Sequence, residues 1–316
     1  MSTQDITRRE AWVIAARPQT LPAAASPVVV GVGLALHDGV FAALPALAAL
    51  VGAGLIQIGT NFANDYYDAV QGADTEDREG FTRVTAGGLI EPETVKRAMY
   101  LAFAAAILVG SYLVYVGGVP ILVIGLLSVA SGIAYTGGPY PLGYHGLGDL
   151  FVFVFFGLVA VAGTYYVQAA AALAGPLPTG IPPGTLPATA FVAALPMAAL
   201  ATDILVVNNV RDREEDAQTG KRTLAVRFGY EFARAEFVAM LALAYAAPLW
   251  FLVRPGFTAA VALPYLTLPY ALDVTRTMLE ETSGDVLNPT LERAGRLLAA
   301  YAIAFAVGLS LTGLPP

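Results

Sequence analysis

The 316-residue chain contains no cysteine, only two histidines (His37 and His145) and only two lysines (Lys96 and Lys221). Without cysteine there can be no disulfide, no thiolate metal site and no thiol catalysis. A His-rich metal site is also not expected from two histidines. Any metal should therefore be held by oxygen atoms, which favours Mg²⁺, Mn²⁺ or Ca²⁺ over Zn²⁺ or Cu²⁺.

Charged residues are scarce as well. They make up 13% of the chain, whereas a typical soluble domain carries about 25%. Hydrophobic residues account for 57%, and the mean hydropathy is +0.65. This composition predicts an integral membrane protein whose surroundings are a lipid bilayer. The net charge of −7 and the low sequence pI of about 4.8 argue against nucleic acid as a partner.

Nine segments are long and apolar enough to cross a bilayer core, which takes roughly 17–25 residues per helix. They lie near 12–36, 41–66, 97–116, 119–136, 148–172, 187–208, 232–253, 257–275 and 293–313. We therefore predict an all-α fold, with a single membrane domain over residues 1–316 and nine transmembrane helices. Pro18 follows Arg17 within the first segment, which predicts a kink or a helix that starts only after Pro18 rather than a cleaved export signal.

The basic residues predict the orientation. With the N-terminus inside, 16 of the 17 Lys and Arg residues fall in inner segments and only Arg254 lies outside. Among the acidic residues, only Asp38 falls in an outer loop. By the positive-inside rule we expect a multi-pass cell-membrane protein with its N-terminus in the cytoplasm and its C-terminus outside.

Two acidic segments end helices on the same predicted side. NFANDYYDAVQGAD (61–74) ends the second helix, and NNVRDREEDAQTGKRTLAVRFG (208–229) ends the sixth. Residues three or four apart share a helix face, so Asn64 stacks with Asp68, with Asn61 and Asp65 alongside. The second segment carries the equivalent stripe of Asn208, Asp212 and Asp216.

Opposed carboxylates repel each other unless a cation lies between them. Mg²⁺ is typically shared between a few carboxylates and substrate phosphates. Basic residues accompany both segments: Arg83 follows the first, and the second contains Arg211, Arg213, Lys221, Arg222 and Arg227. A metal with Arg and Lys around it is a common way to bind a diphosphate and stabilise it as a leaving group. Charged helix ends are often only solvated, and we prefer that interpretation for Glu76, Asp77, Glu79, Glu214 and Glu215.

These segments resemble those of the UbiA superfamily of intramembrane aromatic prenyltransferases. The similarity extends to ARPQTLPAAASPVVVG near the start, to YTGGPYPLGYHGLGDLFVFVFFG (135–157) and to LNPTLERAGRLL before the last helix. Together these motifs are similar to the menaquinone branch, the 1,4-dihydroxy-2-naphthoate polyprenyltransferases. The resemblance covers nearly the whole chain.

The resemblance implies a nine-helix bundle around a central cavity that opens sideways to the lipid. It also implies an Mg²⁺-dependent transfer of a polyprenyl group from polyprenyl diphosphate to an aromatic acceptor, here 1,4-dihydroxy-2-naphthoate, with loss of CO₂ and diphosphate. The matching metal and diphosphate ligands are Asn64 and Asp68, with Asp65 beside them, and the pair Asp212 and Asp216. The superfamily often has a further Asp where this chain has Gly72, and Asp74 follows two positions later.

Further roles follow as hypotheses. We expect Arg83, Lys221 and Arg222 to hold the diphosphate, with Lys221, Asp68, Asp212 and Asp216 as the catalytic set. Tyr135, Thr136 and Tyr140 lie at the inner end of the fourth helix, where they could face the acceptor or the allylic cation. Tyrosines at this depth also serve as membrane-interface anchors, and we interpret His145 as interfacial.

Two alternatives remain at this stage. A prenyltransferase of the same kind could use 4-hydroxybenzoate, homogentisate or an isoprenoid-glycerol phosphate as its acceptor. A secondary transporter with an ion site is the alternative from another class, but transporters usually bind near the bilayer midplane on broken helices, whereas these acidic residues sit at helix ends.

Overall fold

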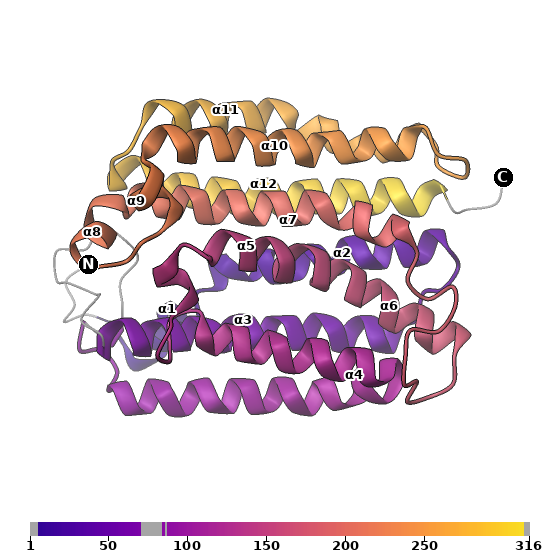
Figure 1. Cartoon of the computed structure of the whole chain (residues 1–316), viewed down its shortest axis with the longest axis horizontal. Coiled ribbons are helices and arrows are strands. Elements are labelled where there is room, and N and C mark those ends of the chain that lie inside the picture. The colour runs from indigo at the N-terminus through magenta and orange to yellow at the C-terminus, as the bar shows by residue number, and fades with distance from the viewer. Residues whose placement is uncertain (1–5, 71–83, 86, 313–316) are drawn as a thin grey trace.

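The computed structural model describes residues 6–70, 84, 85 and 87–312, and these residues form helices and connecting loops with no strand among them. Eight longer helices make up most of the bundle (Figure 1). They are α2 (Leu21–His37), α3 (Ala43–Val70), α4 (Pro92–Ala134), α6 (Ala160–Leu173), α7 (Ala188–Arg211), α10 (Tyr230–Leu252), α11 (Leu268–Glu280) and α12 (Gly284–Thr312). The shorter ones are α1 (Arg8–Ala16), η2 (Pro18–Thr20), η3 (Leu142–His145), α5 (Gly148–Val152), η4 (Phe153–Val159), α8 (Arg213–Gln218), α9 (Leu224–Phe228) and η5 (Ala259–Thr267).

The first predicted span is broken where proline was expected to break it. Helix α1 starts with a capping box, in which Glu10 N–H donates to Thr7 Oγ1 and Thr7 N–H donates to Glu10 Oε2. It ends at Arg17, whose φ of 49° is left-handed. Pro18 follows, and a proline disfavours helical geometry in the residue before it. Helix α2 then starts at Leu21, which confirms a span that begins only after Pro18.

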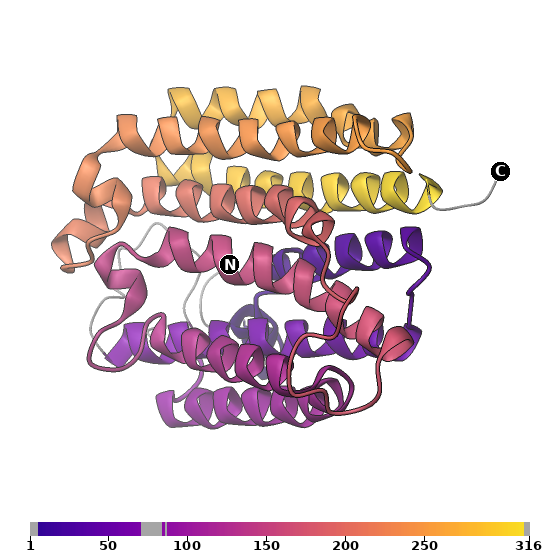
Figure 2. The ribbon, with the colours of Figure 1, turned by 45° about the vertical axis from the view of Figure 1, so that its right-hand side comes forward.

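Helix α4 folds back on itself at Gly118 (Figure 2). At 43 residues it would be about 65 Å long if straight, twice the thickness of a bilayer core of roughly 30 Å. At Gly118 the backbone leaves the helical region, with φ 66° and ψ −150°, and a Cβ there would lie 1.7 Å from Pro178 O. Only glycine fits such a position. Figure 2 shows the two limbs of α4 running back alongside each other, as the separate predicted spans 97–116 and 119–136 require.

Seven helices of the described residues are long and apolar enough to cross a membrane, with α4 counted once. The predicted span 257–275 is absent from these seven because a 3-10 segment, η5, precedes the 13-residue α11. The total of nine crossings therefore stays a prediction. The last span begins earlier than predicted, since α12 starts at Gly284 rather than near 293.

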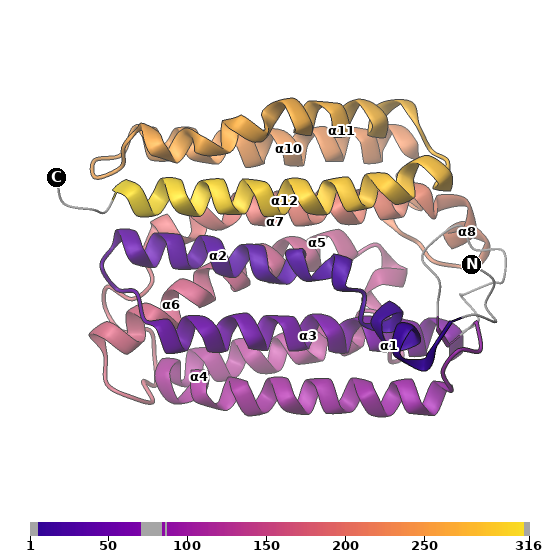
Figure 3. The ribbon, with the colours of Figure 1, turned by 180° about the vertical axis from the view of Figure 1, so that it is seen from behind.

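Buried apolar residues of the described chain form four clusters. The largest joins α2, α6, α7, α10 and α12 and contains the fully buried Tyr301, Phe305 and Leu298. A second joins α1, α3 and α4 around Met99 and Phe103. Seen from behind in Figure 3, α2 lies between α12 and α3. A Cβ at Gly33 of α2 would lie 2.6 Å from the Ala306 backbone of α12, so these two helices are in close contact.

The described parts of both acidic segments, residues 61–70 and 208–229, lie at one end of the bundle. Helices α1, α8 and α9 gather there, whereas the last turns of α12 lie at the opposite end (Figure 1). Residues 61–70 of the first acidic segment form the last turns of α3, which ends at Val70. The second crosses from α7 to α8 at Asp212, the capping residue of both helices.

Candidate active site

Asn64 and Asp68 face the same neighbouring loop. Thr136 Oγ1 donates a hydrogen bond to Asn64 Oδ1 at 2.9 Å, and the Tyr144 hydroxyl donates to Asp68 Oδ1 at 2.8 Å. Both donors come from the connection between α4 and α5. The side chain of Asp68 is buried, although it is a carboxylate in an acidic segment. The predicted stacking of these two side chains along α3 is therefore seen, and their common face meets residues 136–144.

Asp65 has different partners. Its Oδ2 accepts the Thr85 hydroxyl at 2.7 Å and the Thr85 N–H at 3.2 Å, while Arg17 Nη2 lies 3.8 Å from its Oδ1. Asn61 likewise reaches the start of the chain, because its amide donates to Ala16 O. Asp65 is thus held by the segments before α2 and before α4, and its role as a metal ligand stays a prediction.

Asp212 accepts two hydrogen bonds from the residue before it, Arg211. Arg211 Nε donates to Asp212 Oδ1 at 2.6 Å, and Arg211 Nη2 donates to Oδ2 at 2.7 Å. The same guanidinium donates to Asn208 Oδ1 and, across to α12, to Asn288 Oδ1. Both charged side chains are buried. A planar fork of this kind fixes the carboxylate in one orientation and neutralises its charge.

Lys221 joins the two acidic segments. Its Nζ lies 3.6 Å from Asp216 Oδ1 and 3.9 Å from Asp68 Oδ1, and it stands 5.0 Å from the centre of the Tyr144 ring. The carboxylates of Asp68 and Asp216 can therefore be no further apart than the sum of the first two distances. The Lys221 ammonium therefore lies next to the carboxylate of Asp68 in α3 and to that of Asp216 in α8.

Of the other predicted diphosphate ligands, only Arg222 lies among the described residues. Arg222 has an exposed side chain, and it is its backbone N–H that contacts the site, by donating to Tyr144 O at 2.9 Å. Arg227 Nη2 holds the same loop from the other side through His145 O. Arg83 lies outside the described residues, as does Asp74.

The three aromatic and hydroxyl candidates have three different surroundings. Tyr140 is exposed and stacks on His145, with ring centres 3.6 Å apart, so it lies on the surface of the loop. Thr136 is bound to Asn64, as described above. Tyr135, which follows the last residue of α4, lines the cavity instead. Burial raises the pKa of the Tyr135 phenol, and the carboxylates of Asp149, Asp216 and Asp68 raise it further, so the hydroxyl stays protonated.

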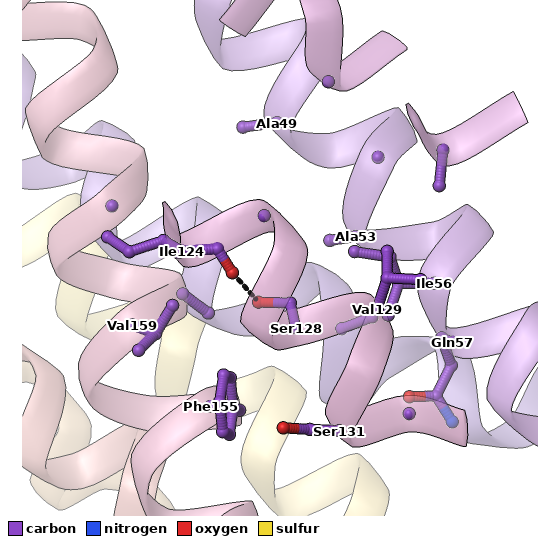
Figure 4. A pocket seen from close by; sticks show the side chains of 18 of the residues that line it. Ala49, Ala53, Ile56, Gln57, Ile124, Ser128, Val129, Ser131, Phe155 and Val159 are labelled. Atoms are coloured by element: carbon purple, nitrogen blue, oxygen red, sulfur yellow. Dashed lines mark hydrogen bonds between the residues drawn. The ribbon is translucent and has the colours of Figure 1, made fainter. Parts of the chain in front are cut away.

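A cavity of about 530 Å³ extends from this site into the bundle. Residues of α2, α3, both limbs of α4, η4 and α6 form its wall, which is mostly apolar (Figure 4). Asn64 and Tyr135 line it beside the acidic residues. Further along, its lining includes Ile107, Leu122 and Leu126 of α4, all of which are exposed. The sideways opening of the cavity to the lipid stays a prediction.

The π-helical segment η4 shapes one wall of this cavity. Phe155 and Phe156 of this segment both lie in the lining. Gly157 in the same segment faces Ala198 of α7, and a Cβ there would lie 2.1 Å from the Ala198 Cβ. The close contact with α7 fixes η4 in place.

The contacts of two residues of the site, Tyr144 and Arg211, were not predicted from the sequence. Tyr144 lies within the motif 135–157, but nothing in a loop sequence indicates which of its tyrosines meets Asp68. Arg211 was recognised only as one basic residue among several. Its adjacency to Asp212 was visible, yet neighbouring residues on a regular helix point about 100° apart, and only the break at Asp212 lets the two side chains pair.

Taken together, the bundle and the site define an integral membrane protein in which acidic and basic side chains gather beside a mostly apolar cavity. A family model described as the UbiA prenyltransferase family matches residues 24–285. The chain belongs to this family.

Curated relatives share the full length. The chain is 37% identical to the 1,4-dihydroxy-2-naphthoate octaprenyltransferase of Escherichia coli (strain K12), over 99% of both chains. It is 36% identical to the protein of the same name from Mycobacterium leprae (strain TN), over 96% of this chain and 97% of that one.

A solved structure shares the fold. The structure of a UbiA homolog from Archaeoglobus fulgidus bound to DMAPP and Mg²⁺ superposes with a TM-score of 0.59 at 16% identity, over 94% of this chain and 99% of that one. At this identity the likeness shows the fold alone.

Proposed function

We propose that this protein transfers a polyprenyl group from polyprenyl diphosphate to 1,4-dihydroxy-2-naphthoate, releasing diphosphate and CO₂ and giving demethylmenaquinol, the reduced form of demethylmenaquinone. The acceptor rests on the full-length relatives, whose names state that acceptor. The observation that carries the reaction class is the meeting of both acidic segments at Lys221, beside a mostly apolar cavity. A diphosphate fits at the charged end, and a hydrocarbon chain fits in the cavity.

We propose Mg²⁺ as the cofactor, held by Asp68 and Asp216 with Asn64 and Asp212 nearby. The donors fit this ion, since they are carboxylate and amide oxygens. Among the described residues no three acidic or histidine side chains are close enough to hold one ion together. That arrangement suits Mg²⁺ bound by one or two carboxylates and completed by substrate phosphate oxygens. When bound, the ion would stabilise the negative charge of the departing diphosphate.

The protein's own residues have three roles in this proposal. Lys221 places a positive charge between the two carboxylates, where it can bind a phosphate oxygen. The Tyr144 hydroxyl and the Arg211 guanidinium fix the orientation of Asp68 and Asp212 before substrate arrives. The apolar wall keeps water away from the allylic cation, so the electron-rich ring rather than water captures it.

The test uses the purified full-length protein in lipid with a labelled polyprenyl diphosphate and Mg²⁺. We expect prenylated product with 1,4-dihydroxy-2-naphthoate, and at least tenfold less with 4-hydroxybenzoate, homogentisate or an isoprenoid-glycerol phosphate. Preferential product with one of these other acceptors would overturn the naphthoate assignment. Product that is independent of Mg²⁺ after chelation would overturn the proposed metal. The transporter alternative has no support now that the chain belongs to a prenyltransferase family.

We also propose that the active-site end of the bundle faces the cytoplasm. The support is the distribution of basic residues, of which only Arg254 falls at the opposite end of the predicted topology. Because the chain has no native cysteine, single cysteines are clean probes. In intact cells a membrane-impermeant maleimide should label Arg254→Cys but not Gln218→Cys. The reverse pattern would invert the orientation without affecting the proposed reaction.

A further inference from the structure

Gln57 is the polar side chain set deepest along α3 in the cavity wall. It precedes Asn64 by seven residues, two helical turns on the same face. It lines the cavity and is only 8% exposed. In Figure 4 its amide oxygen is turned toward the side of Ser131, and its nitrogen points the other way.

The neighbouring hydrogen bonds fix which way the amide points. Asn61 Nδ2 donates to Ala16 O and to Thr20 Oγ1, both at 2.9 Å, so Asn61 Oδ1 must be an acceptor. It accepts from Gln57 Nε2 at 3.3 Å. Thr20 donates its own proton to Arg17 O, so its Oγ1 also accepts from Gln57 Nε2, at 3.0 Å. Both amide hydrogens of Gln57 are therefore committed to these two acceptors.

The remaining oxygen, Gln57 Oε1, is buried and has no hydrogen-bond partner among the described residues. A buried acceptor without a donor costs free energy, and native structures rarely keep one without a reason. A ligand that brings a donor into the cavity would remove this cost. The oxygen therefore selects for a hydrogen-bond donor on whatever binds beside it.

Only one of the proposed substrates carries such a donor. The prenyl chain is a hydrocarbon, and an ionised diphosphate has acceptor oxygens that the amide oxygen would repel. The acceptor ring has two hydroxyls, but its 1-hydroxyl is ortho to the carboxylate and can donate to it internally. Its 4-hydroxyl is free to donate to the protein.

We propose that Gln57 Oε1 accepts a hydrogen bond from the 4-hydroxyl of the naphthoate acceptor and so positions the ring in the cavity, an inference that rests on the proposed function. Gln57 precedes Asp68 by eleven residues, about 16 Å along the helix axis. That distance leaves room for the ring between the amide and the diphosphate end. The carboxylate of the acceptor then points away from Gln57, because the amide oxygen and a carboxylate repel each other.

The test compares two ligands that differ by this one hydroxyl, with the purified full-length protein in lipid. The KM for 1,4-dihydroxy-2-naphthoate is measured together with the inhibition constant of 1-hydroxy-2-naphthoate. We expect the wild type to favour the dihydroxy compound about tenfold, the usual effect of one good hydrogen bond. In Gln57→Met this preference should disappear, while the KM for the prenyl diphosphate changes less than twofold.

Thr20→Val is the matched control. It disturbs the same hydrogen-bond network but leaves the amide oxygen of Gln57 in place, so the preference should persist. Wild-type protein that binds both compounds equally overturns the proposal without any variant, as does a Gln57→Met protein that keeps the wild-type preference. A wild type that turns over the naphthoate in either of these cases leaves the proposed function intact. A wild type without any naphthoate turnover overturns both.

Discussion

Lys221 Nζ lies 3.9 Å from Asp68 Oδ1, although helices α4 to α8 separate these two residues along the chain. The ammonium also contacts Asp216, so one cation neutralises part of the charge of both acidic segments. A diphosphate entering this site would exchange carboxylate contacts of Lys221 for phosphate contacts. The lysine is thus poised to bind the leaving group.

We therefore predict that Lys221→Met raises the KM for polyprenyl diphosphate by tenfold or more and leaves the KM for the acceptor nearly unchanged. A charge-assisted hydrogen bond of about 1.5–3 kcal/mol is lost, which corresponds to roughly one or two powers of ten. Lys96→Met is the control, because Lys96 pairs with the exposed Glu93. Equal KM values for the diphosphate in both variants would remove Lys221 from the site.

The second prediction concerns charge at Asp68 and Asp212. Replacing either with Asn keeps its size and removes its charge, and we expect turnover to fall about 10²–10³-fold, as it does when an electrostatic site loses one donor. The measurement is activity over a Mg²⁺ titration, with thermal stability in parallel. Glu214→Gln, at an exposed carboxylate of the same segment, should change stability by no more than about 0.5 kcal/mol and keep its activity. Near-normal turnover in both Asp variants would contradict the proposed roles.

Asp65 should behave differently from Asp68. Because Asp65 is bound to Thr85 and Arg17, we expect Asp65→Asn to lower the melting temperature while the Mg²⁺ concentration for half-maximal activity stays unchanged. Thr85→Val should produce a similar loss of stability, and the double variant should lose less than the sum of the two. A rise in the Mg²⁺ requirement of Asp65→Asn alone would return Asp65 to the metal site.

Arg211 and Asp212 form a buried ion pair. Removing only the arginine, in Arg211→Met, leaves an uncompensated buried carboxylate, and losses of about 3–5 kcal/mol are usual in that situation. Removing both charges, in Arg211→Met with Asp212→Asn, should recover most of the stability. The measurement is the free energy of unfolding in detergent for the four proteins of this cycle. A double variant no more stable than Arg211→Met would show that Arg211 acts mainly through its other contacts, such as that to Asn288.

The cavity can be narrowed at Gly125. A Cβ there meets no atom within 4 Å, so a larger side chain enters the open space of the cavity without a clash. We expect Gly125→Phe to reduce turnover of long polyprenyl diphosphates at least tenfold while a short allylic diphosphate is still used. Gly54→Phe is the matched control, since Gly54 also has free space around it but does not line the cavity. An equal effect on long and short chains would mean that the prenyl group lies elsewhere.

The sequence alone determined the class of protein, the main helices and the two acidic segments. Hydropathy depends on composition over some twenty residues, so it survives any packing arrangement, and helical periodicity placed Asn64 and Asp68 on one face. Proline and glycine chemistry also acts locally, which is why the break after Arg17 was predictable.

Only the tertiary structure determined which residues each helix face contacts. Periodicity fixes the angle between side chains on one helix but not the rotation of that helix against its neighbours. For this reason the sequence could not show that Asp65 contacts Thr85 while Asp68 meets Tyr144, or that Arg222 is exposed whereas Lys221 lies between two carboxylates. The orientation of the Gln57 amide depends on hydrogen bonds contributed by three separate helical segments, and these come together only when the chain has folded.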